Sequence, residues 1–313
     1  MTVHIKNNHT TFLKDRSLIS KTDPDYKYTI KLKHLDDMNE NEKISIFSDS
    51  MFKTMMTNST RKKYSCKLLS YILDVPYEIL LKELTFGNNE LNKKKVRDKG
   101  ERADFVAHVS DSSIDIEINC SAKLHLLERN IDYMNRLYSR DNKIGSKYNY
   151  KQSILININN FAYQGKDKVK YVHYLKDEEN EALTDKLIVI QIYIPNLIKK
   201  WYTSGVESLT EEERFLLVLV IPDINIALNI GKDFEIMEEY INEAIEVTND
   251  EDFKDFFSKE WDIKYAAYDD GKEDGILEKQ KEIVKKMLEE KMDLNLIMKI
   301  TGLTKEEIEA YQQ

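Results

Sequence analysis

The sequence predicts an α/β fold followed by a mainly helical C-terminal region. Short apolar runs typical of β-strands alternate with segments of helical spacing across roughly residues 46–195. Strands that alternate with helices along a chain are typical of an α/β core. Beyond residue 204, apolar spacing and start signals favour helices. We therefore expect three regions: an N-terminal arm or added lobe at 1–45, a core at 46–204, and a helical region at 205–313.

The first elements of the core are expected to be helices. Apolar residues at helical spacing in 46–75 predict two helices separated near Asn58 and Ser59, and Pro76 ends the second one. A strand is expected at Leu81–Phe86. It leads into a lysine-rich polar loop at 87–100.

Strands dominate the second half of the core. Alternating residues at 103–109 and 114–119, separated by the polar residues 110–113, predict a β-hairpin. A mixed segment without Gly or Pro at 121–141 predicts a helix. Further strands are expected at 153–159 and at 186–194, the latter closed by Pro195.

The C-terminal region carries helix start and stop signals. Thr210, followed by three glutamates, is a good helix start before the apolar run 215–221. A long polar helix is expected from Asp252 onward. The last 22 residues predict two short helices around Gly302, with a capping box formed by Thr304 and Glu307.

Composition excludes several classes of protein. The hydrophobic fraction of 41% supports a packed core, and the longest apolar run, 215–221, is too short to cross a bilayer. The N-terminus lacks the apolar segment of a secretory signal. The two cysteines, Cys66 and Cys120, cannot form a framework of disulfides, so we expect a cytoplasmic protein with no membrane partner.

The net charge of −9 averages two unlike regions. Residues 1–204 hold 34 basic and 27 acidic side chains, a balance of +7, whereas residues 205–313 hold 13 and 29, a balance of −16. A polyanion would be attracted to the first region and repelled by the second. The overall sign therefore does not exclude DNA as a partner, although both balances are also compatible with an ordinary solvated surface.

The hairpin carries the chemistry. A four-residue turn that pairs Val109 with Ile114 gives one fully apolar face and places Asp104 opposite Asn119 on the other. Asp104 and Glu117 are then diagonal neighbours, roughly 7–8 Å apart at the backbone. Two carboxylates with water and a substrate phosphate are a usual ligand set for Mg²⁺. Alternatively, these acids simply face solvent.

Asp104 and the later Glu117-Ile118-Asn119 resemble the D…ExK/ExQ signature of PD-(D/E)XK nucleases. More narrowly, the chain resembles the bacterial Rpn-type, recombination-promoting group of PD-(D/E)XK family transposases. The wider match covers about 46–195 and the C-terminal tail. Its motifs are Phe52-Lys53, ELTFGNNEL, Glu128-Arg129 through Arg136-Leu137-Tyr138, and IMKITGLTKEEIEAY.

The resemblance implies a restriction-endonuclease-like core, a mixed sheet flanked by helices, that cuts DNA with Mg²⁺, or with Mn²⁺ in its place. It maps the metal carboxylates onto Asp104 and Glu117, and the third motif position onto Asn119. Lysine or glutamine is commoner at that position, and asparagine cannot supply positive charge. Lys123, in the helix expected to follow, is a candidate substitute.

Basic residues near the hairpin are candidates for phosphate contacts. The loop residues Lys93, Lys94, Lys95 and Arg97 precede the site and are the better candidates. The cluster at 61–63 is a weaker one, because basic clusters are more often plain surface. The acidic terminal helix pair favours a protein contact over DNA reading, so a homodimer through the C-terminal region is expected.

Two functions of different classes remain open. One is a divalent-metal-dependent DNA endonuclease that hydrolyses phosphodiester bonds, linked to recombination or mobile elements. The other is a nuclease-fold protein with little or no turnover that regulates by binding DNA or protein. The feature that distinguishes the two hypotheses is Asn119, at a position where lysine or glutamine is usual.

Overall fold

The computed structural model describes residues 13, 16–19, 21–87, 104–122, 125–140, 150–290, 292–301 and 308. Two compact units make up the chain, residues 1–254 and residues 255–313. The first unit contains the sheet and its covering helices. Residues 205–254, which we expected in a separate helical region, belong to this same unit.

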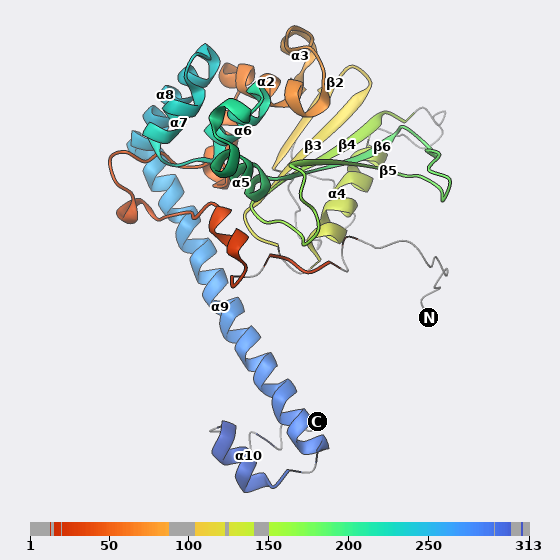
Figure 1. Ribbon diagram of the computed structural model, residues 1–313, viewed down its shortest axis with the longest axis vertical. Coiled ribbons are helices and arrows are strands. Elements are labelled where there is room, and N and C mark those ends of the chain that lie inside the picture. The colour runs from red at the N-terminus through yellow and green to blue at the C-terminus, as the bar shows by residue number, and fades with distance from the viewer. Residues whose placement is uncertain are drawn as a thin grey trace. The chain divides into compact units, whose positions relative to one another are not determined.

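A six-stranded sheet with the order β1-β2-β3-β4-β6-β5 forms the centre of the first unit (Figure 1). Its strands are β1 (Thr85–Phe86), β2 (Phe105–Val109), β3 (Ser112–Asn119), β4 (Gln152–Asn159), β5 (Lys170–Tyr174) and β6 (Leu187–Tyr193). Strands β3, β4 and β6 are parallel, whereas β1, β2 and β5 run antiparallel to their neighbours. The sheet is therefore mixed, as the α/β prediction with a restriction-endonuclease-like core required.

The two faces of the sheet differ in chemistry because side chains alternate along each strand. On one face, buried isoleucines of β3, β4 and β6 align in register, and Phe105 contacts Phe52 of helix α1 (Asp49–Met56) with ring centroids 6.2 Å apart. The opposite face carries buried polar side chains. Helix α4 (Leu126–Arg140) packs across β3 and β4 on this polar face.

The remaining helices complete both units. They are α2 (Lys62–Leu73), α3 (Tyr77–Glu83), α5 (Ile194–Ser204), α6 (Glu211–Val220), α7 (Ile224–Gly231), α8 (Glu235–Asn249), α9 (Glu251–Glu289) and α10 (Leu294–Thr301). The predicted start of α6 is confirmed, because the Thr210 and Glu213 side chains form a reciprocal capping box. The second terminal helix and its capping box fall mostly outside the described residues.

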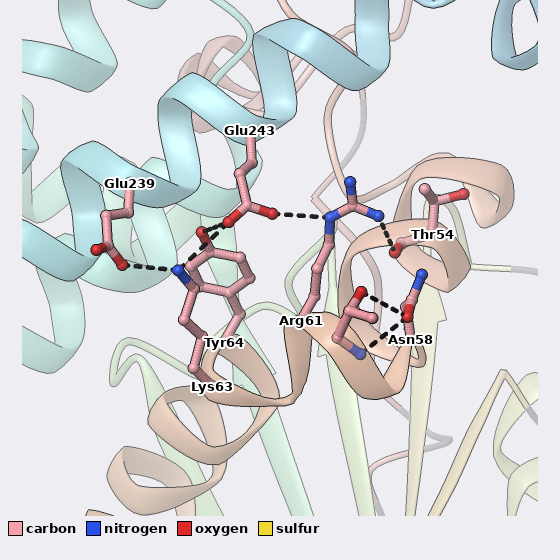
Figure 2. A network of polar contacts seen from close by, with 8 residues as sticks. Thr54, Asn58, Arg61, Lys63, Tyr64, Glu239 and Glu243 are labelled. Carbon is pink, nitrogen blue, oxygen red and sulfur yellow. Dashed lines mark hydrogen bonds and ion pairs between the residues drawn. The ribbon is translucent and has the colours of Figure 1, made fainter.

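Helices α2 and α8 are joined by the polar network in Figure 2. Glu243 of α8 lies 2.8 Å from Arg61 Nε and accepts a hydrogen bond from the Tyr64 hydroxyl at 2.7 Å. Lys63 Nζ lies 2.8 Å from Glu239 and 3.3 Å from Glu243. Arg61 and Lys63, weighed above as phosphate contacts, therefore serve as partners of the acidic C-terminal half of this unit.

The described part of the N-terminal segment is attached to the sheet. Its turns η2 (Pro24–Tyr28) and η3 (Leu35–Asp37) precede α1. Leu18 forms a bridge with Tyr163, and both the N–H and the C=O of Ile30 bond to the Asn160 side chain. These contacts place the segment beside the carboxyl ends of the parallel strands.

Two strand predictions need correction. The first half of the expected strand at Leu81–Phe86 is the end of α3, because Leu80 and Leu84 are buried at helical spacing and only Thr85 and Phe86 pair with β2. Strand β5 was not predicted. It is an edge strand whose side chains are largely exposed, so it lacks the apolar alternation that identifies a strand. Among the described residues, no helix combines the length and the apolar character needed to span a membrane.

Lys43 is fully buried against α6 and α8. Its ammonium donates a hydrogen bond to the Val218 carbonyl at 2.9 Å and lies 5.6 Å from the centre of the Tyr240 ring. Burial lowers the pKa of Lys43 from 10.5 to about 7. Below pH 7 the folded protein is destabilised by the buried charge. Between pH 7 and 10.5 the unfolded chain binds the additional proton, so stability rises with pH.

Replacement of Lys43 by methionine tests this linkage. We expect Lys43→Met to be more stable than the wild type at pH 6, by about 1–4 kcal/mol, since one pKa unit corresponds to about 1.4 kcal/mol and the Val218 carbonyl loses its partner. The advantage should disappear towards pH 10.5. Urea unfolding of both proteins at pH 6, 8 and 10 measures the difference, and a difference independent of pH would contradict the prediction.

Candidate metal centre

The hairpin that carries the two predicted carboxylates has a tighter turn than expected. Strand β3 begins at Ser112, which pairs with both Val109 and Gln152, so the turn contains only Ser110 and Asp111. Ser110 adopts a φ of 47°, as tight hairpin turns require. The register is shifted by two residues from the prediction. Because side chains alternate, the two faces are unchanged but the cross-strand partners differ.

The shifted register brings Asp104 and Glu117 together. Asp104 directly precedes β2, and the register continued by one residue places it opposite Glu117. The Asp104 N–H donates to Glu117 Oε1 at 3.2 Å, and the Ile118 N–H donates to Asp104 Oδ2 at 3.0 Å. The two carboxylates therefore lie on neighbouring strands at one end of the sheet. The predicted pairing of Asp104 with Asn119 is wrong, because it assumed the longer turn.

A third carboxylate, Asp115, lies two residues before Glu117 on the same face of β3. It is buried beside Val106 and Leu155, its register partners on β2 and β4. Neither of its carboxylate oxygens has a hydrogen-bond partner among the described residues. A buried carboxylate without a partner is costly, so its presence indicates a ligand or a proton at this position.

Burial and mutual repulsion act on all three acids. Burial, with the nearby Asp49 carboxylate, raises the pKa of Asp104 to about 6. Burial and then Asp104 raise the pKa of Asp115 well above its ordinary value, and burial followed by Asp115 and Asp104 does the same for Glu117. A cation between these groups would favour their charged forms.

Asn119, the third predicted site residue, is held in a ladder of buried amides. Its Nδ2 donates to Asn159 Oδ1 at 3.0 Å and to Asn157 Oδ1 at 3.3 Å. Asn159 in turn donates to Gln191 Oε1 at 2.8 Å, and the Asn130 side chain of α4 donates to Asn157 Oδ1. The parallel register of β3, β4 and β6 aligns these amides side by side. The Asn119 side chain is therefore fixed rather than mobile.

Arg129 in the first turn of α4 is a member of the site that the hairpin argument did not identify. Its Nη2 lies 3.4 Å from Glu117 Oε2, and its Nε donates to Asn130 Oδ1 at 3.2 Å. Its charge counteracts the rise in the pKa of Asp104, Asp115 and Glu117. The sequence signal for the amides is the Asn157 and Asn159 pair in an otherwise apolar strand. Arg129 belongs to the Glu128-Arg129 motif of the family resemblance, but the sequence assigned it no role at the site.

The donor set at this end of the sheet fits a hard divalent cation. Asp104 and Glu117 supply adjacent oxygens, and Asp115 supplies oxygens that have no hydrogen-bond partner in the described part of the chain. Within the described ranges, no three His, Cys, Asp or Glu side chains are already gathered around one point. Two carboxylates completed by water and phosphate are nevertheless sufficient for Mg²⁺. The predicted phosphate contacts Lys93, Lys94, Lys95, Arg97 and Lys123 lie outside the described residues.

A family match shows to which proteins this chain is related. Residues 46–252 match the family model of the PD-(D/E)XK nuclease family transposases. The chain belongs to this family. The match covers the sheet, its helices and α6–α8, and it confirms the resemblance inferred from Asp104 and the Glu117-Ile118-Asn119 motif. PD-(D/E)XK nucleases generally use divalent metal ions, and the function of this chain is accordingly related to a nuclease or transposase. No curated protein and no solved structure matches the chain.

The C-terminal tail has its own family match. Residues 277–313 match the C-terminal helix-turn-helix domain of the Rpn/YhgA-like nuclease family. A small core forms there from Val284 of α9, Ile297 of α10 and Ile308, with methionines and leucines around it. A helix-turn-helix domain on a PD-(D/E)XK nuclease implies DNA binding. The acidic composition of the terminal helices had favoured a protein contact, which the family match does not support.

Asp115 offers a test of the repulsion within the site. We expect Asp115→Val to stabilise the metal-free protein by about 1–3 kcal/mol, because it removes a buried carboxylate with no partner among the described residues and suits a strand between apolar neighbours. Chemical unfolding in the presence of a chelator measures the change. Asp111→Asn, in the exposed turn of the same hairpin, is the control and should shift stability by less than about 0.5 kcal/mol. A destabilised Asp115→Val would show that Asp115 has a partner.

Proposed function

We propose that this protein is a Mg²⁺-dependent endodeoxyribonuclease that hydrolyses phosphodiester bonds in recombination or the movement of mobile elements. The proposal rests on one observation. Asp104 and Glu117 lie side by side, and Asp115 on the same sheet face has no hydrogen-bond partner among the described residues, in a chain that belongs to a nuclease family. Three buried acids would be destabilising without a partner, whereas a bound cation would compensate their negative charge.

The residues of the site have distinct roles in this proposal. Asp104 and Glu117 would hold the divalent ion, which would lower the pKa of the attacking water and stabilise charge on the phosphate. Asn119, fixed by Asn157 and Asn159, orients the attacking water. A bond forms between the water oxygen and phosphorus, while the bond from phosphorus to the leaving ester oxygen breaks. The proton lost by the water passes to solvent, and the leaving oxygen takes a proton from solvent.

DNA contacts are proposed on the basic part of the chain and on the tail. Residues 1–204 carry a balance of +7, and the loop residues Lys93, Lys94, Lys95 and Arg97 with Lys123 remain our candidates for contacts to phosphates near the site. The helix-turn-helix domain supplies a second DNA-binding part. Affinity for DNA should therefore depend on salt.

A second function is favoured by a specific observation at Asn119. Its Nδ2 donates to the side chains of Asn157 and Asn159, and the residue carries no charge. A site without the usual lysine at this position fits a DNA- or protein-binding regulator with weak or absent turnover. The two functions differ in whether any divalent ion supports cleavage by the wild type.

Substitution of the carboxylates tests the enzyme directly. We expect Glu117→Gln and Asp104→Asn to abolish Mg²⁺-dependent cleavage of plasmid and single-stranded DNA, because each removes a charged metal ligand while keeping side-chain volume. Asn119→Ala should lower the rate by about 10–100-fold and retain metal binding measured by calorimetry, since it affects orientation rather than charge. Asp111→Asn is the matched control and should cleave at the wild-type rate.

Two outcomes would contradict the proposal. Undiminished cleavage by Glu117→Gln would place the active centre elsewhere. A wild type that binds DNA but cleaves with neither Mg²⁺ nor Mn²⁺ would establish the regulator instead.

We also propose that the C-terminal helical region mediates a homodimer. Phe256 and Ile263 of α9 are 56% and 70% exposed and lie seven residues apart, which places them on the same side of the helix. We expect Phe256→Ser with Ile263→Ser to shift the mass measured by light scattering from dimer towards monomer. A wild type that is monomeric at micromolar concentration would contradict the dimer.

A further inference from the structure

Arg129 reaches from a buried network to the surface at the candidate metal centre. Its Nε bonds to the buried Asn130, and its guanidinium carbon lies 5.5 Å from the centre of the Tyr133 ring. These two contacts fix the orientation of the guanidinium. The side chain is still 40% exposed, so the group is accessible to a ligand.

The contact between Arg129 and Glu117 is long for a charge-assisted hydrogen bond. The distance from Nη2 to Oε2 is 3.4 Å, whereas strong pairs of this kind are usually about 2.7–2.9 Å. Glu117 is buried while Arg129 is partly in solvent. The pair is therefore loose enough for the guanidinium to take another anion when a cation occupies the carboxylates.

The charge of the site favours a phosphate as a second partner of Arg129. Three carboxylates at the same end of one sheet face repel a phosphate, and Asn119 carries no charge to offset them. Two described cations act on the acids, namely Lys53, which counteracts the raised pKa of Asp104, and Arg129, which does so for Asp104, Asp115 and Glu117. A guanidinium also matches the oxygens of a phosphate with two parallel donors, which an ammonium cannot do.

We propose that Arg129 is the phosphate-binding group of this site and contacts a non-bridging oxygen of the DNA phosphate that approaches Asp104 and Glu117. The inference rests on the proposed nuclease function and adds to it the residue that supplies positive charge to the substrate. The charge comes from α4 instead of from the strand that carries the carboxylates.

DNA binding without cleavage provides the first test. Asp104→Asn serves as the background, because it blocks hydrolysis and leaves the Arg129–Glu117 pair intact. Affinity for a short duplex is measured between 50 and 200 mM salt in this background, alone and combined with Arg129→Gln, Arg129→Lys or Arg136→Gln. Arg136 is the matched control, since it lies two turns along α4 and is held by Asp132 at 2.8 Å.

The slope of log affinity against log salt gives the expected result. Arg129→Gln should reduce its magnitude by about 0.9, which corresponds to one lost phosphate contact. Arg129→Lys keeps the charge and should keep the slope, and Arg136→Gln should leave it unchanged. An equal slope for Arg129→Gln and its background would overturn the inference, and this comparison remains decisive even if the wild type never cleaves.

Metal affinity separates a phosphate-binding role from a structural one. Calorimetry with Mg²⁺ on proteins that otherwise carry the wild-type sequence should show tighter binding by Arg129→Gln, because a positive charge next to the carboxylates is removed. A variant that merely disturbed the site would bind Mg²⁺ more weakly, and this result would count against the proposal.

Cleavage kinetics complete the experiment if the wild type is active. Arg129→Gln should lower kcat/KM by about 10²–10³-fold, the usual effect of losing one group that stabilises transition-state charge. Arg129→Lys should fall between it and the wild type, and Arg136→Gln should match the wild type. An active wild type with an equally active Arg129→Gln would leave the nuclease function standing and refute the role of Arg129.

Discussion

The structure of the candidate metal centre depends on one constraint, which is the burial of polar and acidic groups between α4 and the sheet. Water is largely excluded there, so each carboxylate and amide must be satisfied by protein groups or by a ligand. Most of the amide groups are satisfied by bonding to one another across three parallel strands, although Asn157 Nδ2 has no hydrogen-bond partner among the described residues. Asp115 has no such solution among the described residues, and the acidic end of the face is consequently the part that needs an external partner.

Apolar burial on the opposite face of the sheet offsets the energetic cost of this polar layer. Isoleucines in register on β3, β4 and β6 line this apolar face, and Phe105 on the same face contacts Phe52 of α1. Burial of this apolar face stabilises the strands, and the same strands carry the candidate metal centre on their other face. The site can therefore carry repelling charges without determining whether the chain folds. This division between a stabilising face and a functional face follows from the two-residue period of a strand.

The sequence predicted the faces of the hairpin but not its register. Alternation places Asp104 and Glu117 on one face whichever turn is used, whereas the partner of Asp104 depends on whether the turn has two residues or four. The polar residues 110–113 look alike in composition, and only the pairing of Ser112 with Gln152 on a later strand decides the turn. Arg129 was missed for a related reason, because its contact with Glu117 depends on how α4 crosses the sheet. Local elements with their own signals, such as the Thr210 cap, were predicted correctly.

The ion pairs between α2 and α8 show that acids of the C-terminal region neutralise basic residues of the core. Among the described residues, four basic side chains before residue 204 form ion pairs with acids beyond it: Arg61 with Glu243, Lys63 with Glu239, Lys67 with Glu211, and Lys200 with Glu213. Part of the C-terminal acidity is thus internal counter-charge. A fragment ended at residue 204 would present four newly unpaired cations, so part of its attraction to nucleic acid would result from the truncation rather than from a surface of the intact molecule.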